Sequence, residues 1–190
     1  MEPAGLSTLI DGCRAGDSLA WEGFVRHFQG RVFALAYSYA GEREDARDLA
    51  QEIFVRLYEA RAQWVTGDEF LPWMFRVARN RSVDYLRRKK VRTPVVTVDE
   101  SVIADLPDPA PSAEVMAVDS HRRGLLHAAL RGLSAINRDI VVLRDVHGLS
   151  IQQVSSILGI PLGTVKSRAS RARVELAERV MALARGRGAV

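Results

Sequence analysis

Residues 148–176 read GLSIQQVSSILGIPLGTVKSRASRARVEL, and this stretch decides the fold of the C-terminal part of the chain. Ser150 and Gln153 have the spacing of a capping box, in which the serine side chain caps the first turn of a helix. Gly159 suits the left-handed conformation that ends such a helix, and Pro161 is tolerated in the first turn of the next one. We therefore predict two helices joined by a tight turn, which is the arrangement of a helix-turn-helix.

The second of these helices has a cationic face. At about 100° per residue, one apolar side is formed by Leu162, Val165, Ala169, Ala172 and Leu176. The opposite side and its edges carry hydroxyls and cations, with no acid before Glu175: Thr164, Lys166, Ser167, Arg168, Ser170, Arg171 and Arg173. Arginine can pair with guanine in a major groove, and the remaining charges can neutralise phosphate. The pattern therefore favours DNA recognition over an ordinary solvated helical face.

Helical periodicity also covers most of the rest of the chain. Apolar residues recur at helical spacing over 21–39, and further helices are predicted from about Glu42 to Ala60 and from about Glu69 to Lys90. Residues 93–111 contain four prolines and scattered acids, so they cannot form one long helix. We predict an all-α protein with two small helical domains joined by a flexible linker, the second being the helix-turn-helix domain.

The predicted boundaries are residues 1–92 for the first domain, 93–117 for the acidic linker and 118–185 for the second domain. Few core contacts are expected to cross such a linker. Cleavage between residues 99 and 110 is therefore expected to release two helical fragments.

Composition excludes several classes of protein. A single cysteine, Cys13, rules out a disulfide within the chain and a cysteine zinc site, and it is expected to be a small apolar filler. The four histidines lack metal-ligand spacing, so no metal and no cofactor are expected. No apolar run reaches the length of a membrane span, and the first residues lack the pattern of a signal peptide. The expected compartment is the cytoplasm.

The predicted first domain is polarised. Acids outnumber arginines in residues 42–60, whereas residues 76–92 are strongly basic, with Asp84 as their one acid. Two readings fit this pattern: two solvated faces with local ion pairs, or surfaces for two partners, a basic protein groove and nucleic acid.

Three blocks of residues resemble one family, the extracytoplasmic-function sigma factors of bacterial RNA polymerase, which belong to the sigma-70 family and have only domains two and four. Asp45–Phe54 resembles the family's core-binding helix, with its acid, Gln-Glu and Phe in register. Phe70–Asn80 with Asp84–Arg88 resembles the promoter-melting segment and its basic end. Gly163–Arg173 resembles the helix that reads the −35 element. The blocks follow the family's order and span nearly the whole chain.

The resemblance implies a transcription initiation factor, not an enzyme, that binds core RNA polymerase and directs it to promoter DNA. Residues implied in core binding are Asp45, Asp48, Gln51, Glu52 and Phe54. Those implied at the −10 element are Thr66, Asp68, Arg76, Asn80, Asp84, Arg87 and Arg88. Those implied at the −35 element are Thr164, Lys166, Ser167, Arg168, Arg171 and Arg173. An anti-sigma factor is expected as a further partner, and no membrane insertion of the chain itself.

Three other readings remain at this point. A dimeric helix-turn-helix regulator of duplex DNA would explain the second domain, but it would leave the 45–54 block without a role and would need an apolar dimer seam. A recombinase or nuclease would need a nucleophile or a carboxylate cluster for metal. An adaptor or anti-sigma protein would have no need of a recognition helix. Promoter-specific transcription with core polymerase separates all of these.

Overall fold

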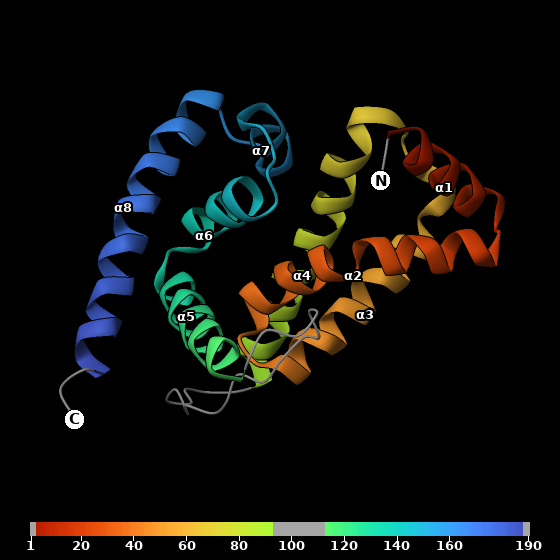
Figure 1. Cartoon of the computed structure of the whole chain (residues 1–190). Helices are drawn as coiled ribbons and strands as arrows, with labels where there is room; N and C mark the ends of the chain where they lie inside the picture. The colour runs from red at the N-terminus through yellow and green to blue at the C-terminus, as the bar shows by residue number, and fades with distance from the viewer. Residues whose placement is uncertain (1–2, 93–112, 188–190) are drawn as a thin grey trace.

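The computed structural model describes residues 3–92 and 113–187, and every element in these two ranges is a helix (Figure 1). This confirms the predicted all-α class. The N-terminal range contains α1 (Pro3–Ala15), α2 (Ser18–Ala40), α3 (Arg43–Glu59), the short helices η1 (Arg61–Gln63) and η2 (Gly67–Glu69), and α4 (Phe70–Arg92). The C-terminal range contains α5 (Ala113–Gly132), α6 (Ala135–Val141), η3 (Val142–Val146), α7 (Ile151–Leu158) and α8 (Leu162–Arg187).

Most of the predicted linker, residues 93–112, lies outside the described ranges. Its last predicted residues, 113–117, form the first turn and more of α5. The C-terminal helices therefore begin a few residues earlier than the predicted boundary at residue 118.

Aromatic packing builds the core of the first domain. Phe24 lies with its ring centroid 4.8 Å from that of Phe28 and 4.6 Å from that of Trp64. The Trp64 indole N–H donates to the carbonyl of Leu57 at 3.0 Å, which satisfies the polar atom of a buried side chain. Phe70 closes the cluster 5.3 Å from Trp64. These contacts join α2, α3 and the start of α4, so the two helices that carry the acidic and basic surfaces have a fixed relative position.

Local signals set the ends of several helices. Asp17 accepts from the Leu19 amide at 2.8 Å as N-cap of α2, and Gly41, at φ +82°, ends that helix. The predicted capping box of α7 is present, because Ser150 accepts from the Gln153 amide at 3.1 Å and Gln153 accepts in return from the Ser150 amide at 2.8 Å. Gly159 is left-handed, at φ +65°. The predicted helix-turn-helix is therefore formed by α7 and α8.

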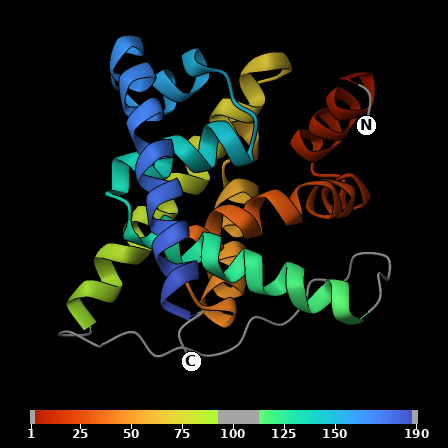
Figure 2. The same ribbon diagram turned by 60° about the vertical axis from the view of Figure 1, so that its left-hand side comes forward.

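The two domains pack directly against each other. Figures 1 and 2 show the α5–α7 helices lying beside α2 and α4, with α8 on the side of α5 and α6 away from the first domain. α4 contacts α7, α2 contacts α5, and buried apolar side chains from both ranges form one continuous cluster. This packing was not expected from the sequence.

Cys13 belongs to that apolar cluster and is only 1% exposed. Burial, with the nearby Asp17 carboxylate, raises the pKa of its thiol to about 11. The thiol is therefore protonated at neutral pH, which fits the expected packing role.

Candidate partner-binding and nucleic-acid surfaces

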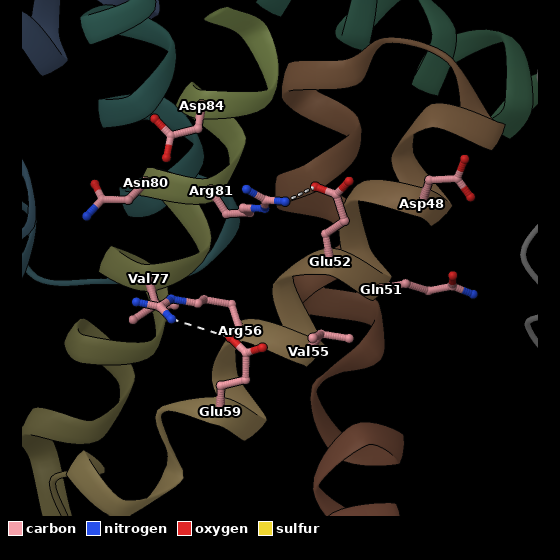
Figure 3. A pocket seen from close by; sticks show the side chains of 10 residues that line it. All are labelled: Asp48, Gln51, Glu52, Val55, Arg56, Glu59, Val77, Asn80, Arg81 and Asp84. Atoms are coloured by element: carbon pink, nitrogen blue, oxygen red, sulfur yellow. Dashed lines mark hydrogen bonds and ion pairs between the residues drawn. The ribbon is translucent and has the colours of Figure 1, made fainter. Parts of the chain in front are cut away.

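An open groove of about 880 Å³ runs between α3 and α4 (Figure 3). Its walls bring together residues predicted for core binding and residues predicted for the −10 element. The lining residues are Asp48, Gln51, Glu52, Val55, Arg56, Glu59, Val77, Asn80, Arg81 and Asp84. The groove is mostly polar, with Val55 as an exposed apolar side chain on the α3 wall. Such a surface suits a protein partner that offers cations around a small apolar contact.

Part of the acidic charge of α3 is used inside the domain. Glu52 pairs with Arg81 at 2.8 Å and with Arg88 at 2.9 Å. Asp45 accepts from Lys89 at 2.6 Å and from Tyr85 at 2.7 Å. The hydrogen bond from Lys89, together with that from Tyr85, lowers the pKa of the Asp45 carboxyl despite its partial burial. These pairs join α3 to α4, whereas the ion-pair reading expected pairs within each helix. The reading of two partner surfaces stays a prediction.

The other predicted core-binding residues divide into two groups. Asp48 and Gln51 are exposed, and within the described residues neither has a hydrogen-bond or ion-pair partner. Phe54 is partly buried and packs edge-on against Trp21, with 6.2 Å between ring centroids. Asp48 and Gln51 are thus the free polar groups of the predicted core-binding set, whereas Phe54 packs inward against the core.

The predicted −10 residues lie along α4 and in the turn that precedes it. Thr66 and Asp68 are exposed beside Gly67, whose φ of +65° makes the turn. Asn80 and Asp84 are exposed on the α4 wall of the groove. Arg87, with 78% of its side chain exposed, lies 3.7 Å from Asp84 at the basic end of the helix.

Arg76 differs from these residues because its guanidinium already hydrogen-bonds to the second domain. Its guanidinium donates to the carbonyl of Ser156 at 3.0 Å and to the Ser156 hydroxyl at 2.8 Å. Arg88 is likewise occupied, by Glu52. Two of the cations predicted to contact DNA therefore have protein partners in this conformation.

The predicted −35 residues form an exposed face on α8. Lys166, Ser167, Arg168 and Arg171 are exposed, and Thr164 is half-buried at the start of the helix. On the opposite side the predicted apolar residues Val165, Ala169 and Ala172 are buried, whereas Leu162 remains 36% exposed. The helix thus presents its cations and hydroxyls outward, as the 100° periodicity predicts.

Arg173 is the exception on this face. Its guanidinium forms a bidentate ion pair with Asp145, in which Nε donates to Oδ2 at 2.9 Å and Nη2 donates to Oδ1 at 2.5 Å. Within the described residues no such acid accompanies Arg168 or Arg171. These two arginines are therefore the best placed of the set to reach base edges.

Sequence reasoning missed Asp139, which is a buried carboxylate between the two domains. It accepts from the Tyr39 hydroxyl and, at 2.7 Å, from Nε of Arg79. These partners are 100 and 60 residues away in the sequence, so no local pattern could have paired them.

Within residues 3–92 and 113–187, no group of three or more histidines, cysteines or acids is placed to hold a metal ion. None of the described helices combines the length and the apolarity needed to cross a membrane.

Family models match both domains. Residues 24–92 match Sigma-70 region 2, and residues 123–176 match Sigma-70 region 4, together more than half of the chain. The ECF RNA polymerase sigma factor SigE of Mycolicibacterium smegmatis is 37% identical over 166 residues, which cover 85% of this chain and 63% of that protein. The ECF RNA polymerase sigma factor SigW of Bacillus subtilis is 29% identical over 174 residues, which cover 86% of this chain and 90% of that protein.

Solved structures share the fold. CnrH, in complex with the cytosolic domain of CnrY, has a TM-score of 0.67 at 20% identity and covers 93% of this chain and 97% of its own. RpoE of Bartonella quintana, in complex with the anti-sigma factor NepR, has a TM-score of 0.65 at 24% identity and covers 84% of this chain and 98% of its own. With region 2 and region 4 both matched, and in that order, the chain belongs to the sigma-70 family, in its extracytoplasmic-function (ECF) group.

Proposed function

We propose that this chain is a transcription initiation factor, which binds core RNA polymerase through α3 and directs it to promoters through α4 and α8. The observation that carries the proposal is the presence of two separate free surfaces in one chain. The α3 surface offers Asp48 and Gln51 beside an open groove, and the α8 surface offers Arg168 and Arg171 among hydroxyls. Membership of the ECF group supports assigning the first surface to the polymerase and the second to the −35 element.

On this proposal the chain is not an enzyme, because the polymerase supplies the chemistry and the chain supplies sequence recognition. It acts in the cytoplasm, where polymerase and chromosome meet. An anti-sigma factor is proposed as a further partner, as the RpoE protein of Bartonella quintana has in NepR.

The test is transcription in a purified system. Core polymerase with this chain is expected to produce transcripts that start at specific promoters, and core polymerase alone is not. A dimeric regulator of duplex DNA would instead bind its site without core polymerase and would yield no new start sites. That result would overturn the proposal.

Reversing the charge of Asp48 is expected to weaken core binding. Asp48→Lys places a cation on the face proposed to meet a basic groove, and Asp48 has no partner in the described part of the chain whose loss would disturb the fold. An exposed contact of this kind is worth about 1 kcal/mol, or roughly a fivefold change in Kd. Titration of labelled chain with core polymerase measures it.

Glu22→Lys is the matched control, because it makes the same charge change on α2, away from the groove, where Glu22 pairs with Arg26 one turn later. It is expected to leave the Kd unchanged. Equal losses for Asp48→Lys and Glu22→Lys would mean that net charge, and not the α3 face, governs the affinity.

Removing the Arg87 side chain is expected to weaken DNA binding on all sequences alike. The guanidinium of Arg87 is largely exposed at the basic end of α4, so it is assigned to phosphate. Loss of one phosphate contact reduces the slope of log K against log salt by about 0.7–0.9. Binding of the holoenzyme to several promoter variants across a salt series measures this slope. Arg14→Ala, on α1, removes the same charge elsewhere and is expected to leave the slope unchanged.

A further inference from the structure

We propose that the free chain closes on itself through a buried latch, in which Asp139 of the second domain is held by Tyr39 and Arg79 of the first, and that this latch must open for promoter recognition. The inference rests on the proposed function for its second half. The closed state itself rests only on contacts within this chain.

The latch is a charged pair buried between domains. Asp139 is only 1% exposed, and its two carboxylate oxygens accept from different helices, one from Tyr39 on α2 and the other from Arg79 on α4. Burial, reinforced by the charge of Asp139, raises the pKa of the Tyr39 hydroxyl well above its usual value, so the hydroxyl remains a donor. A carboxylate so deeply buried is stable only while its partners stay in place. The pair therefore specifies one arrangement of the two domains.

Further contacts extend this interface along the C-terminal end of α2. Arg138 donates to the carbonyl of Ser38 at 3.2 Å, and Arg131 donates to the carbonyl of Gly41 at 3.3 Å. Both carbonyls belong to the C-terminal end of α2, where helix carbonyls lack intrahelical partners. Arginines of the second domain thus donate hydrogen bonds to backbone carbonyls at the C-terminal end of α2.

Ring contacts add a third layer. The ring of His127 meets that of Tyr37 edge-on, with 4.3 Å between centroids, and the ring of His147 lies 4.5 Å from that of Phe75. The first contact holds α5 against α2. The second contact, together with the hydrogen bonds from Arg76 to Ser156, holds the start of the helix-turn-helix against α4. The surface that they cover is part of the segment proposed to engage the −10 element.

The closed arrangement is incompatible with simultaneous recognition of both promoter elements. Positions −10 and −35 are about 25 base pairs apart, which corresponds to about 85 Å along a duplex at about 3.4 Å per pair. In the closed chain α4 and α7 lie within hydrogen-bond distance of each other. The domains must therefore separate before α4 and α8 can occupy their two elements.

Closure has a defined effect on binding. A chain whose binding-competent form is only a small fraction of the population has an apparent affinity reduced by that fraction. A partner that binds only the open form shifts the equilibrium toward the open form. A partner that contacts both domains in their closed arrangement shifts it toward the closed form. The latch thus limits the fraction of the chain that can place α4 and α8 on their two promoter elements at once.

Small-angle X-ray scattering of the full chain tests the closed state. A compact chain of this length is expected to have a radius of gyration of about 16 Å, and wild-type protein is expected to approach that value. Asp139→Asn removes the charge that pairs with Arg79 and leaves one acceptor oxygen where the carboxylate has two. It is expected to raise the open-to-closed ratio at least about tenfold and the radius of gyration by several ångströms. Asp145→Asn is the matched control, because Asp145 pairs with Arg173 inside the second domain.

A milder variant keeps the test decisive if Asp139→Asn does not fold. Tyr39→Phe removes one hydroxyl from the latch and leaves the Arg79 pair, so it is expected to give a smaller increase in the same direction. Wild-type protein that is already extended, or a radius of gyration unchanged in both folded variants, would overturn the latch.

Titration with core polymerase separates the two halves of the inference. If the latch limits engagement, Asp139→Asn is expected to bind core polymerase up to about tenfold more tightly than wild type. Unchanged affinity in an opened variant would overturn the regulatory role. Failure of every variant to bind core polymerase or to direct transcripts would overturn the proposed function, while the scattering result would still decide the closed state.

Discussion

Acidification from pH 7 to pH 5 is expected to lower the free energy of unfolding by about 4 kcal/mol, or about 2 kcal/mol for each of two histidines. Burial, with the nearby charge of Arg131, lowers the pKa of His127 to about 4. Burial, with the charge of Arg31, lowers the pKa of His147 to about 4. Both rings are therefore neutral in the native protein at neutral pH.

The sign follows from proton uptake. Between the usual histidine pKa of 6.5 and the native value of about 4, the unfolded chain binds protons that the native chain does not. Stability is therefore highest above pH 6.5 and falls as the pH decreases through that window. The carboxylates contribute at lower pH, because the lowered pKa of Asp45 places its stabilising effect above its usual pKa of 3.8.

Urea unfolding at pH 5, 6 and 7 measures the effect. The double variant His127→Phe, His147→Phe keeps the ring contacts with Tyr37 and Phe75 and cannot be protonated. The free energy of unfolding of this double variant is expected to depend only weakly on pH. A weak dependence remains because His27 also has a lowered pKa. An equal loss of stability in wild type and double variant would show that other groups cause it. Both histidine rings contact aromatic rings of the first domain, and protonation disfavours their burial there. The two domains are therefore expected to separate, and the radius of gyration to rise, over the same pH range.

Alanine at Arg168 or at Arg171 is expected to cost about 1–3 kcal/mol on the preferred −35 element and to relax discrimination at one base pair. Both side chains are exposed on the outer face of α8 and neither has an acid partner in the described part of the chain. An arginine that is free in this way can form two hydrogen bonds with a guanine edge. Binding to a panel of single-base −35 variants at constant salt measures the discrimination.

Arg179→Ala provides the control on the same helix. Arg179 pairs with Glu175 at 3.0 Å one turn before it, so its loss changes charge without removing a free guanidinium from the predicted DNA face. It is expected to weaken binding slightly and equally on every variant. If Arg168→Ala and Arg171→Ala do the same, α8 contributes only general affinity for DNA.

The elements that could be predicted from the sequence are those with local causes. The capping box at Ser150 and Gln153 and the left-handed Gly159 depend on residues within a few positions, and the structure has all of them. The third helix was predicted to begin near Glu69, and α4 begins at Phe70. Helical periodicity also placed Val165, Ala169 and Ala172 on the buried side of α8.

The pairing of charges could not be predicted, because it depends on how distant helices pack. Arg173 was assigned to DNA with its neighbours, yet Asp145, 28 residues earlier, holds it. Glu52 was assigned to the polymerase, and two arginines of α4 share it. Asp139 follows Asn137 and Arg138 and precedes an apolar run, and no residue near it in the sequence indicates its partners. The assignment of the free residues to core polymerase and to the two promoter elements remains a prediction.

The aromatic core of the first domain has a consequence for spectroscopy. All three tryptophans, Trp21, Trp64 and Trp73, lie in residues 1–92, and the second domain has none. Intrinsic fluorescence therefore reports melting of the first domain alone, whereas circular dichroism reports the helices of both. Coincident melting curves from the two signals would show that the domains unfold as one cooperative unit, and curves that separate in an Asp139 variant would give the strength of their coupling without any added label.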